Sequence, residues 1–183
     1  MSTKKNLNLS KEELEIPEGI EVEIDGQMIR VKNGSSSVEK KMPNAKVTKE
    51  SNKLVISMPR STKREKKQVN AIKAHIKNMF LGLNNKYIYK LQVCSVHFPM
   101  NLTIKDNYLL IKNFLGETKE RKAAIVTGAE VQIERDIITV SSSNKESAGQ
   151  TTANIEKATR TKHKDRRVFQ DGIYMIEKPG KIA

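Results

Sequence analysis

The strongest constraint on the fold is an apolar pattern that occurs twice, about 80 residues apart. In each copy, apolar residues alternate with polar ones in short runs, which is typical of β-strands with one buried face. A shift of 80 or 84 positions sets the apolar residues of one copy over those of the other. Repetition along a chain indicates a tandem duplication, and chance alternation in a β-rich sequence is the alternative. The paired sets are Val22, Ile24, Ile29 and Val31 with Leu102, Ile104, Leu109 and Ile111, and Val47, Leu54 and Ile56 with Val131, Ile138 and Val140.

The first copy predicts two β-hairpins. Alternating apolar residues across 22–31 flank an Asp-Gly turn signal and predict the first hairpin. The second is expected from two short strands, 46–50 and 54–58. A polar connector of three serines, residues 35–37, is expected between the hairpins. Order is expected to begin near Ile16, after a mobile arm or a loose edge strand.

A helix is predicted after the second hairpin. Thr62 and Glu65 have the spacing of a capping box, and Gly82 is expected to end the helix in a left-handed conformation. Residues 86–96 then predict a long strand because they are rich in Tyr, Ile and Val. The residues with helical spacing are Val69, Ile72, Ile76, Met79 and Leu83.

The second copy is expected to follow the same element order. Ser147 and Gln150 predict a second capped helix, whose apolar pattern fades after Ala158. The sequence therefore predicts an α+β fold of two tandem duplicated domains, each an antiparallel sheet with one packed helix. The expected boundaries are 1–84 for the N-terminal domain and 85–183 for the C-terminal domain.

The charge of the chain favours an anionic partner. The chain carries a net charge of +13 and a pI near 9.8, which points to a nucleic acid or an anionic membrane surface. No apolar run approaches the roughly 20 residues that span a bilayer, and the N-terminus lacks the apolar core of a signal peptide. We therefore expect no membrane partner and a cytoplasmic location.

The sequence predicts no disulfide, metal site or catalytic site. A single cysteine, Cys94, excludes an intramolecular disulfide, and three dispersed histidines disfavour a metal site. The sequence contains neither of the glycine-rich phosphate-binding patterns, G-x-x-x-x-G-K-[ST] and G-x-G-x-x-G. His97, beside Phe98-Pro99, is interpreted as a structural residue at a strand end. We therefore expect no cofactor and no enzymatic activity.

The densest positive charge lies in KATRTKHKDRRVFQDG, residues 157–172, which carries six Lys or Arg against one Asp before Phe169. Such density favours contact with phosphates, although a solvated basic tail is the alternative. The pattern from Tyr174 onward predicts a strand, so the stretch is interpreted as a loop held at both ends. A tethered loop loses less conformational entropy on binding than a free tail. The predicted RNA-binding residues here are Lys157, Arg160, Lys162, His163, Lys164, Arg166, Arg167, Phe169, Gln170, Gly172 and Lys178.

Two further stretches are candidates. Residues 113–122 contribute Lys119, Arg121 and Lys122, and the alternative is an ordinary exposed β-loop. Residues 60–67 place positive charge at the start of the first helix, where an anion would relieve the conflict with the helix dipole. The alternative for that stretch is a solvated helix entry.

Three segments carry a family resemblance: AHIKNMFLGL (74–83), VCSVHFPMN (93–101) and AGQTTANIEKATRTKHKDRRVFQDGIYMIEKPGK (148–181). They resemble the L-six family of large-subunit ribosomal proteins, in its archaeal and eukaryotic branch, where the eukaryotic member is called L-nine. The chain departs from the family at VKNGSSSVEK (31–40), where a Lys-Gly-rich turn is common. It also has HKDRRVFQDGIY (163–174) where the bacterial branch has a Tyr-Lys-Gly-Lys-Gly pattern.

The resemblance implies a duplicated α+β fold and binding to large-subunit ribosomal RNA, mainly through the C-terminal domain. It implies a location near the sarcin-ricin loop and the base of the factor-binding stalk, beside neighbouring ribosomal proteins, and no independent homo-oligomer. We therefore expect a structural component of the large ribosomal subunit. The alternatives from other classes are a basic RNA-processing enzyme and an architectural nucleic-acid-binding protein.

Overall fold

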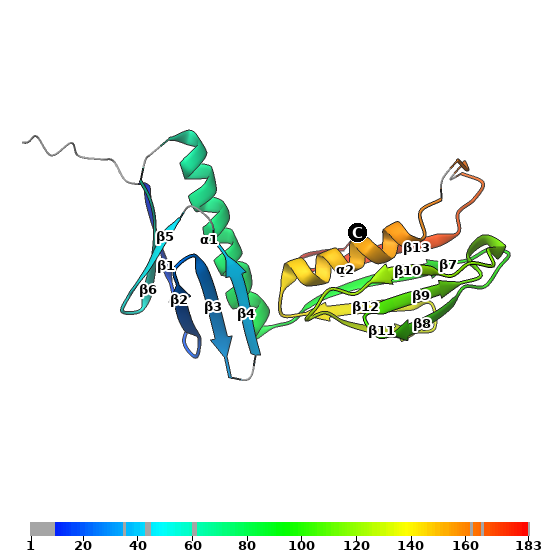
Figure 1. Ribbon diagram of the computed structural model, residues 1–183, viewed down its shortest axis with the longest axis horizontal. Helices are drawn as coiled ribbons and strands as arrows, with labels where there is room; N and C mark the ends of the chain where they lie inside the picture. Colours follow the sequence, from blue (N-terminus) through cyan, green and yellow to red (C-terminus); the bar gives the residue numbers. More distant parts are fainter. Residues whose placement is uncertain are drawn as a thin grey trace, which may run out of the picture. The chain divides into compact units, whose positions relative to one another are not determined.

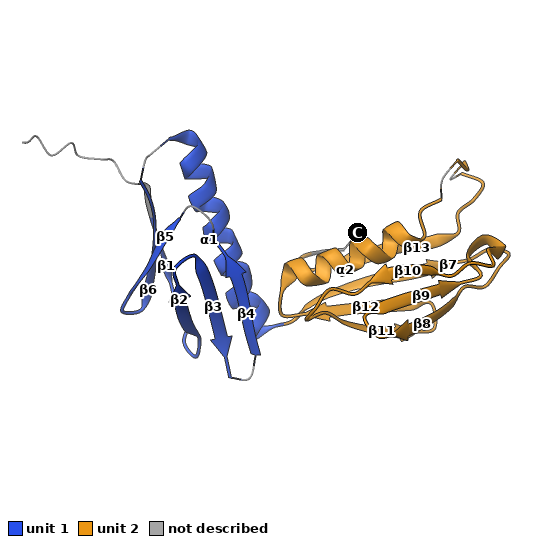
Figure 2. Cartoon of the chain, viewed as in Figure 1, with its two compact units in different colours: residues 1–85 blue, residues 86–183 orange. Residues whose placement is uncertain are grey.

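The chain forms two compact units in a computed structural model, residues 1–85 (unit 1) and residues 86–183 (unit 2) (Figure 2). The structure describes residues 10–34, 36–42, 45–59, 62–161, 163–165 and 167–182. Each unit combines antiparallel strands with one α-helix (Figure 1). The predicted α+β fold of two duplicated domains is therefore confirmed.

Unit 1 has two three-stranded antiparallel sheets and one long helix. The sheets have the strand orders β2-β3-β4 and β1-β6-β5. In chain order the elements are β1 (Ser10–Glu15), β2 (Glu21–Asp25), β3 (Met28–Asn33), β4 (Ser36–Lys41), β5 (Lys46–Glu50), β6 (Lys53–Met58) and α1 (Lys63–Asn84).

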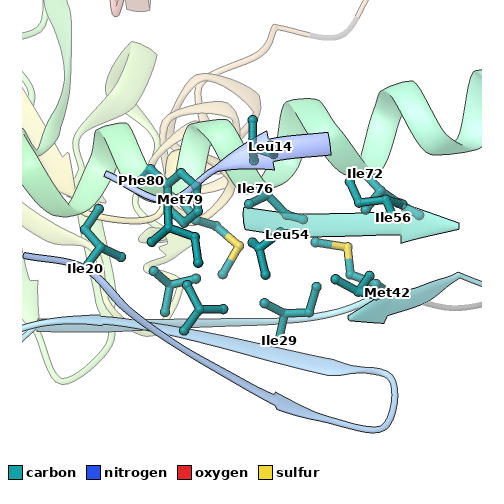
Figure 3. Packing of buried hydrophobic residues seen from close by; sticks show 14 of the residues in the cluster. Leu14, Ile20, Ile29, Met42, Leu54, Ile56, Ile72, Ile76, Met79 and Phe80 are labelled. Carbon is teal, nitrogen blue, oxygen red and sulfur yellow. The ribbon is translucent and has the colours of Figure 1, made fainter. Parts of the chain in front are cut away.

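Apolar side chains from both sheets and from α1 meet in one core. Ile29 of β3, Leu54 of β6 and Ile76 of α1 point into the same interior (Figure 3) and are almost completely buried. Such burial removes apolar surface from water and is the main favourable contribution to folding. The packing of α1 on β1, β3, β4 and β6 therefore joins the two small sheets into one domain.

The first helix begins as predicted but ends later. The Thr62 hydroxyl accepts a hydrogen bond from the Glu65 amide, and the Glu65 carboxylate accepts one from the Thr62 amide, which confirms the capping box. The prediction that Gly82 ends the helix is wrong. Gly82 is buried within α1, which continues to Asn84 because Phe80 and Leu83 still pack on the core.

Two expectations about the polar strands are corrected. Of the expected connector at 35–37, Ser35 lies outside the described residues, and residues 36 and 37 belong to β4. This strand pairs with β3 and contributes one buried residue, Val38, opposite Val31. A strand with a single buried residue lacks the alternation that identifies strands. Strand β1 begins at Ser10, six residues before Ile16, and pairs with β6 at the edge of its sheet. For residues 10–15 the alternative of an edge strand is therefore confirmed, whereas residues 1–9 lie outside the described residues.

Unit 2 repeats this plan and extends it. Its sheets have the strand orders β10-β9-β8 and β11-β12-β7-β13-β14, and α2 packs on β7, β10, β12 and β13. In chain order the elements are β7 (Tyr87–Cys94), β8 (Asn101–Lys105), β9 (Tyr108–Lys112), a short 3-10 turn (Phe114–Gly116), β10 (Arg121–Ala124), β11 (Glu130–Glu134), β12 (Ile137–Ser142), α2 (Lys145–Ala158), β13 (Gly172–Lys178) and β14 (Lys181–Ile182).

Strand register confirms the repeat residue by residue. In the first hairpin Val22 lies opposite Val31, and in the second copy Leu102 lies opposite Ile111, 80 positions later. The second hairpin pairs Val47 with Ile56, and its counterpart pairs residues 131 and 140, 84 positions later. A register shift of one residue would turn every side chain to the opposite face, so equal registers mean equal core faces.

The predicted start of the second helix is wrong. Asn144 is the N-cap of α2, since its side chain accepts a hydrogen bond from the Glu146 amide at 3.0 Å. Its carbonyl accepts from the Ala148 amide at 3.1 Å, so the helix is already formed where Ser147 was expected to cap it. Asn and Ser are similarly good caps, and the apolar pattern alone does not choose between them.

The main addition in unit 2 is the strand that follows its helix. Sheet β1-β6-β5 of unit 1 corresponds to β7-β12-β11 of unit 2, in which β13 pairs with the other edge of β7. The chain therefore leaves α2, passes through residues 159–171 and returns to the sheet at Gly172, two residues before the expected Tyr174 (Figure 1). This arrangement holds the most basic stretch of the sequence between two ordered elements.

Candidate nucleic-acid interface

Residues 159–171, here called the basic loop, are fixed at both ends by buried hydrogen bonds. At the start, the buried Thr159 hydroxyl accepts from the Ile173 amide at 2.9 Å and donates to the Glu156 carbonyl at 3.2 Å. At the end, the buried Asp171 carboxylate accepts from the Val96 amide at 2.6 Å. The loop is thus held between the helix and the sheet and is not a free tail.

A tight turn shapes the middle of the basic loop. The Asp165 side chain accepts from the Arg167 amide at 2.9 Å, and its carbonyl accepts from the Phe169 amide, also at 2.9 Å. Asp side chains commonly stabilise turns by accepting from an amide two residues on. After the turn, the Tyr174 hydroxyl donates to the Gln170 carbonyl at 3.2 Å. Local hydrogen bonds therefore shape the described residues at the end of the loop, from Asp165 to Gln170.

Three segments meet at one end of unit 2: residues 95–99, 113–122 and 157–171, which we call the basic end. The first two are joined because the Asn113 side chain donates to the Pro99 carbonyl at 3.1 Å. Asp171 and Val96 join the first and third segments, as described above. The second and third are joined by Arg121, whose guanidinium donates to the Ala158 carbonyl at 2.9 Å. Each segment is thus bonded to both of the others.

A groove runs between the second and third segments. Its volume is about 550 Å³. Two stretches that were predicted from the sequence as separate RNA-binding candidates, 113–122 and 157–172, therefore form one surface. The groove is lined by Leu115, Glu117, Arg121, Lys122, Lys157, Ala158, Arg160, Thr161 and Lys164.

The acidic side chains of the basic end are used internally. Glu117 pairs with Arg121 at 2.6 Å, and Glu120 pairs with Lys112 at 2.8 Å. Asp165 and Asp171 accept backbone hydrogen bonds. The Arg121 hydrogen bond lowers the pKa of Glu117, and the charges of Arg121 and Lys164 lower it further. Glu117 is therefore anionic at neutral pH, and all four carboxylates already accept hydrogen bonds or pair with a cation.

The cations of the basic end are left without such partners. Within the part of the chain that the structure describes, none of the exposed ones forms an ion pair. Like charges this close repel one another unless an anion lies between them. The unpaired cations are Lys119, Lys122, Lys157, Arg160, Lys164 and Arg167.

Other predicted residues of the loop are placed as follows. His163 and Gln170 are exposed, and the Gln170 side chain donates to the Arg167 carbonyl at 3.3 Å. Phe169 is 37% exposed, and the Lys164 ammonium lies 4.4 Å from the centre of its ring, which holds the two side chains together. Lys162 and Arg166 lie outside the described residues.

Three predicted residues are not placed with the exposed cations. Arg121 lines the groove but is only partly exposed, and its guanidinium is turned toward Glu117 and the end of α2. Gly172 is buried in β13, where an added Cβ would lie 2.9 Å from the Tyr174 ring. Lys178 is exposed at the far end of β13, about 20 Å from Gly172 at the usual rise of a strand.

The stretch 60–67 belongs to unit 1. Arg60 lies outside the described residues. Lys63, Arg64, Lys66 and Lys67 are exposed on the first turns of α1, and the capping box of Thr62 and Glu65 occupies the helix N-terminus.

Several residues of the interface were not predicted. Thr159 and Asp171 hold the ends of the loop, and neither gives a signal in the sequence because both act through distant backbone amides. Glu117 could have been found, since it lies four residues before Arg121, a common spacing for ion pairs. No group of three or more His, Cys, Asp or Glu within the described ranges is placed to hold a metal ion. Nor is any described helix both long and apolar enough to cross a bilayer.

Comparison with known proteins identifies the family. The profile of ribosomal protein L6 matches residues 16–85 and 98–172, one match for most of each unit. The chain is 40% identical over 176 residues to a protein of Methanococcus vannielii named large ribosomal subunit protein uL6, covering 95% of this chain and 97% of that one. Proteins of the same name from Methanobrevibacter smithii and Sulfurisphaera tokodaii are each 41% identical over 170 residues, covering 92% and 91% of this chain and 96% and 91% of theirs. Since both the profile and full-length relatives match, the chain belongs to the ribosomal protein L6 family.

Proposed function

We propose that this protein is a structural component of the large ribosomal subunit and binds ribosomal RNA through the basic end of unit 2. The observation that carries the proposal is the group of exposed cations around one groove, whose neighbouring carboxylates are all engaged elsewhere. The names of the archaeal relatives support the assignment to the large subunit of a cytoplasmic ribosome. Membership of a family of ribosomal proteins also confirms the prediction that the chain is not an enzyme.

The mechanism is adhesion and not chemistry. Arg160 and Arg167 can each grip a phosphate with two parallel hydrogen bonds, whereas Lys122, Lys157 and Lys164 act as point charges. Phosphate contacts supply affinity without reading sequence. Specificity is expected from the fit of the ordered loop to a folded RNA, because an A-form helix hides its base edges in a narrow groove.

The finer location follows from the family resemblance. We propose contact near the sarcin-ricin loop and the base of the factor-binding stalk, with neighbouring ribosomal proteins beside it. Crosslinking from the basic loop to ribosomal RNA in isolated large subunits tests this location. Crosslinks confined to other RNA regions would contradict it and leave the RNA-binding proposal standing.

The binding proposal is tested by removing the two exposed arginines. Each charge-assisted hydrogen bond is worth on the order of 1.5–3 kcal/mol, so Arg160→Ala with Arg167→Ala should weaken affinity for large-subunit ribosomal RNA at least roughly tenfold. The slope of log affinity against log salt should also fall, by about 0.7 to 0.9 for each phosphate that the variant no longer neutralises. Filter binding across a salt series measures both quantities.

A matched control removes the same charge from unit 1. Lys63→Ala with Lys66→Ala also lowers the net charge by two, at two exposed positions on α1. If the basic end is the main binding surface, this control should weaken binding much less. Equal losses from the two pairs would mean that only net charge matters, and the proposal would be wrong.

A further inference from the structure

We propose that Arg121 is a positioning residue of the RNA-binding surface: it fixes the end of α2 and the start of the basic loop and does not contact RNA itself. This inference rests on the proposed function. It assigns Arg121 a role different from the direct RNA contact that the sequence suggested. Four observations support it.

The first is that the hydrogen-bonding capacity of Arg121 is almost fully used. A guanidinium has five N–H donors. Nε donates to Glu117 Oε2 at 2.8 Å, and one terminal nitrogen donates to Glu117 Oε1 at 2.6 Å. The other terminal nitrogen donates to the carbonyls of Ala158 at 2.9 Å and Arg160 at 3.3 Å. Little remains with which to grip a phosphate.

The second is that one face of the guanidinium is covered. Its central carbon lies 4.3 Å from the centre of the Phe114 ring, and Phe114 is 1% exposed. An arginine stacked on a buried ring and bonded along its edges is held in a single orientation. To grip a phosphate with two parallel hydrogen bonds through the edge that now binds Glu117, the guanidinium would have to abandon Glu117.

The third concerns the carbonyls that Arg121 binds. Ala158 is the last residue of α2, and the last carbonyls of a helix have no partner within it. A cation at this end also complements the helix dipole. Arg121 therefore stabilises the helix end and, through Arg160, fixes the direction in which the chain leaves it.

The fourth is that this exit direction sets the groove. Lys157, Arg160 and Lys164 lie on either side of the helix end and line one wall, while Lys122, next to Arg121, lines the other. The Arg121 contacts join these walls. Without them the cations remain present, but their common orientation has to be re-formed on binding, at an entropic cost.

The Glu117→Gln variant separates positioning from charge. It removes one negative charge next to the groove, so a purely electrostatic surface would bind RNA more tightly. If Arg121 is a positioning residue, weakening its two hydrogen bonds to residue 117 should instead lower the affinity for protein-free large-subunit ribosomal RNA by at least about threefold. The salt slope should stay unchanged, because the same phosphates are neutralised as in the wild type.

Glu120→Gln is the matched control. It makes the same charge change three residues away, where the carboxylate forms its ion pair with Lys112 and does not hydrogen-bond to Arg121. Its affinity should equal or exceed that of the wild type. Arg121→Lys keeps the charge but cannot donate two parallel hydrogen bonds to Glu117, so its RNA affinity should fall as in Glu117→Gln. If Arg121→Lys does not fold, the isosteric Glu117→Gln variant still tests whether Arg121 acts by positioning. Thermal unfolding shows whether each variant is folded.

Two outcomes overturn the inference. Tighter binding by Glu117→Gln, as for Glu120→Gln, would show that charge alone matters at this position. A reduced salt slope in Arg121→Gln, which removes the positive charge, would show that Arg121 itself neutralises a phosphate. Failure of the proposed function looks different: wild-type protein would bind this RNA weakly and with a flat salt dependence, whatever the variants do.

Discussion

The Thr159 hydroxyl accepts a hydrogen bond from the Ile173 amide at 2.9 Å, and this bond joins the C-cap residue of α2 to the second residue of β13. Both residues are buried, at 3% and 1% exposure. A buried amide without a partner costs free energy, because neither water nor protein replaces the missing hydrogen bond. The base of the basic loop is thus closed by one side chain.

Replacing Thr159 with Val should destabilise unit 2. Valine has nearly the same shape, but it cannot accept from Ile173 or donate to Glu156. The free energy of unfolding of unit 2 should fall by about 1–3 kcal/mol, the usual cost of leaving a buried polar group unpaired. Denaturant unfolding measures the change, and hydrogen exchange at the Ile173 amide should accelerate.

Thr161→Val provides the control for this prediction. Thr161 lies two residues further along, is half-buried, and its side chain makes no hydrogen bond to any residue that the structure describes. Its replacement should change stability by less than about 0.5 kcal/mol. If both variants are equally stable, the Thr159 hydrogen bonds contribute nothing to closing the loop.

Gly172→Ala should disturb the exit from the loop. An added Cβ would lie 2.9 Å from the Tyr174 ring, closer than carbon atoms normally approach. The ring would have to move, and its hydroxyl would no longer reach the Gln170 carbonyl. We expect the stability of unit 2 to fall by about 1–3 kcal/mol, as for other overpacked sites.

A double variant identifies the cause of that destabilisation. In a Tyr174→Leu background the ring is absent, so Gly172→Ala should cost much less than it does alone. Thermal unfolding of the four proteins of the cycle gives the coupling between the two positions. Additive effects would place the strain elsewhere, for instance in the backbone of β13.

Local patterns in the sequence were sufficient to predict most of the fold. The hairpin around residues 22–31 and its copy follow from alternation and turn residues, and the start of α1 follows from the spacing of Thr62 and Glu65. These signals lie within a few residues of one another. Strand β4 was missed because only Val38 is buried, so its place depends on pairing with β3 and not on its own pattern.

The candidate site was only partly predictable, for a related reason. Charge density drew attention to residues 157–172 and 113–122, but it could not show that they share a groove. It also treated Arg121 like its neighbours, whereas the structure turns its guanidinium toward Glu117 and the end of α2. Such roles depend on contacts nearly 40 residues apart in the chain, which no local pattern encodes.

The two units should respond separately to changes in their cores. Leu54 of unit 1 is completely buried, in a cluster that contains only residues of unit 1. Leu54→Ala removes apolar contacts and leaves a cavity, which usually costs about 2–5 kcal/mol. Amide protection should fall across the strands of unit 1 in hydrogen exchange.

Protection in unit 2 should remain as in the wild type, since its buried cluster around Leu91 and Ile138 shares no residue with that of unit 1. Ile138 occupies the position in unit 2 that Leu54 occupies in unit 1, so Ile138→Ala is the reciprocal control. A fall in protection across both units from either variant would mean that they unfold as one cooperative body.

The pH dependence of the Arg121–Glu117 pair can be predicted from the direction of the Glu117 shift. The hydrogen bond from Arg121 holds the pKa of Glu117 below its ordinary value of 4.5. When the folded pKa is lower than the unfolded one, the group stabilises the protein fully above the unfolded value and ceases to do so as pH falls through the folded value. The pair should therefore be intact throughout the neutral range and break only in acid, below about pH 4.5.

Carboxyl NMR titration of Glu117 tests this directly. In the wild type, Glu117 should titrate below 4.5, and in Arg121→Gln its pKa should rise toward the ordinary value because the hydrogen bond and the nearby charge are both removed. Glu120 is the internal reference, since the pKa of this carboxyl is lowered by Lys112, which the variant leaves in place. A Glu117 pKa that does not change in Arg121→Gln would mean that Lys164 and not Arg121 controls this carboxylate. Glu117 could then not be what fixes the Arg121 guanidinium at the end of α2.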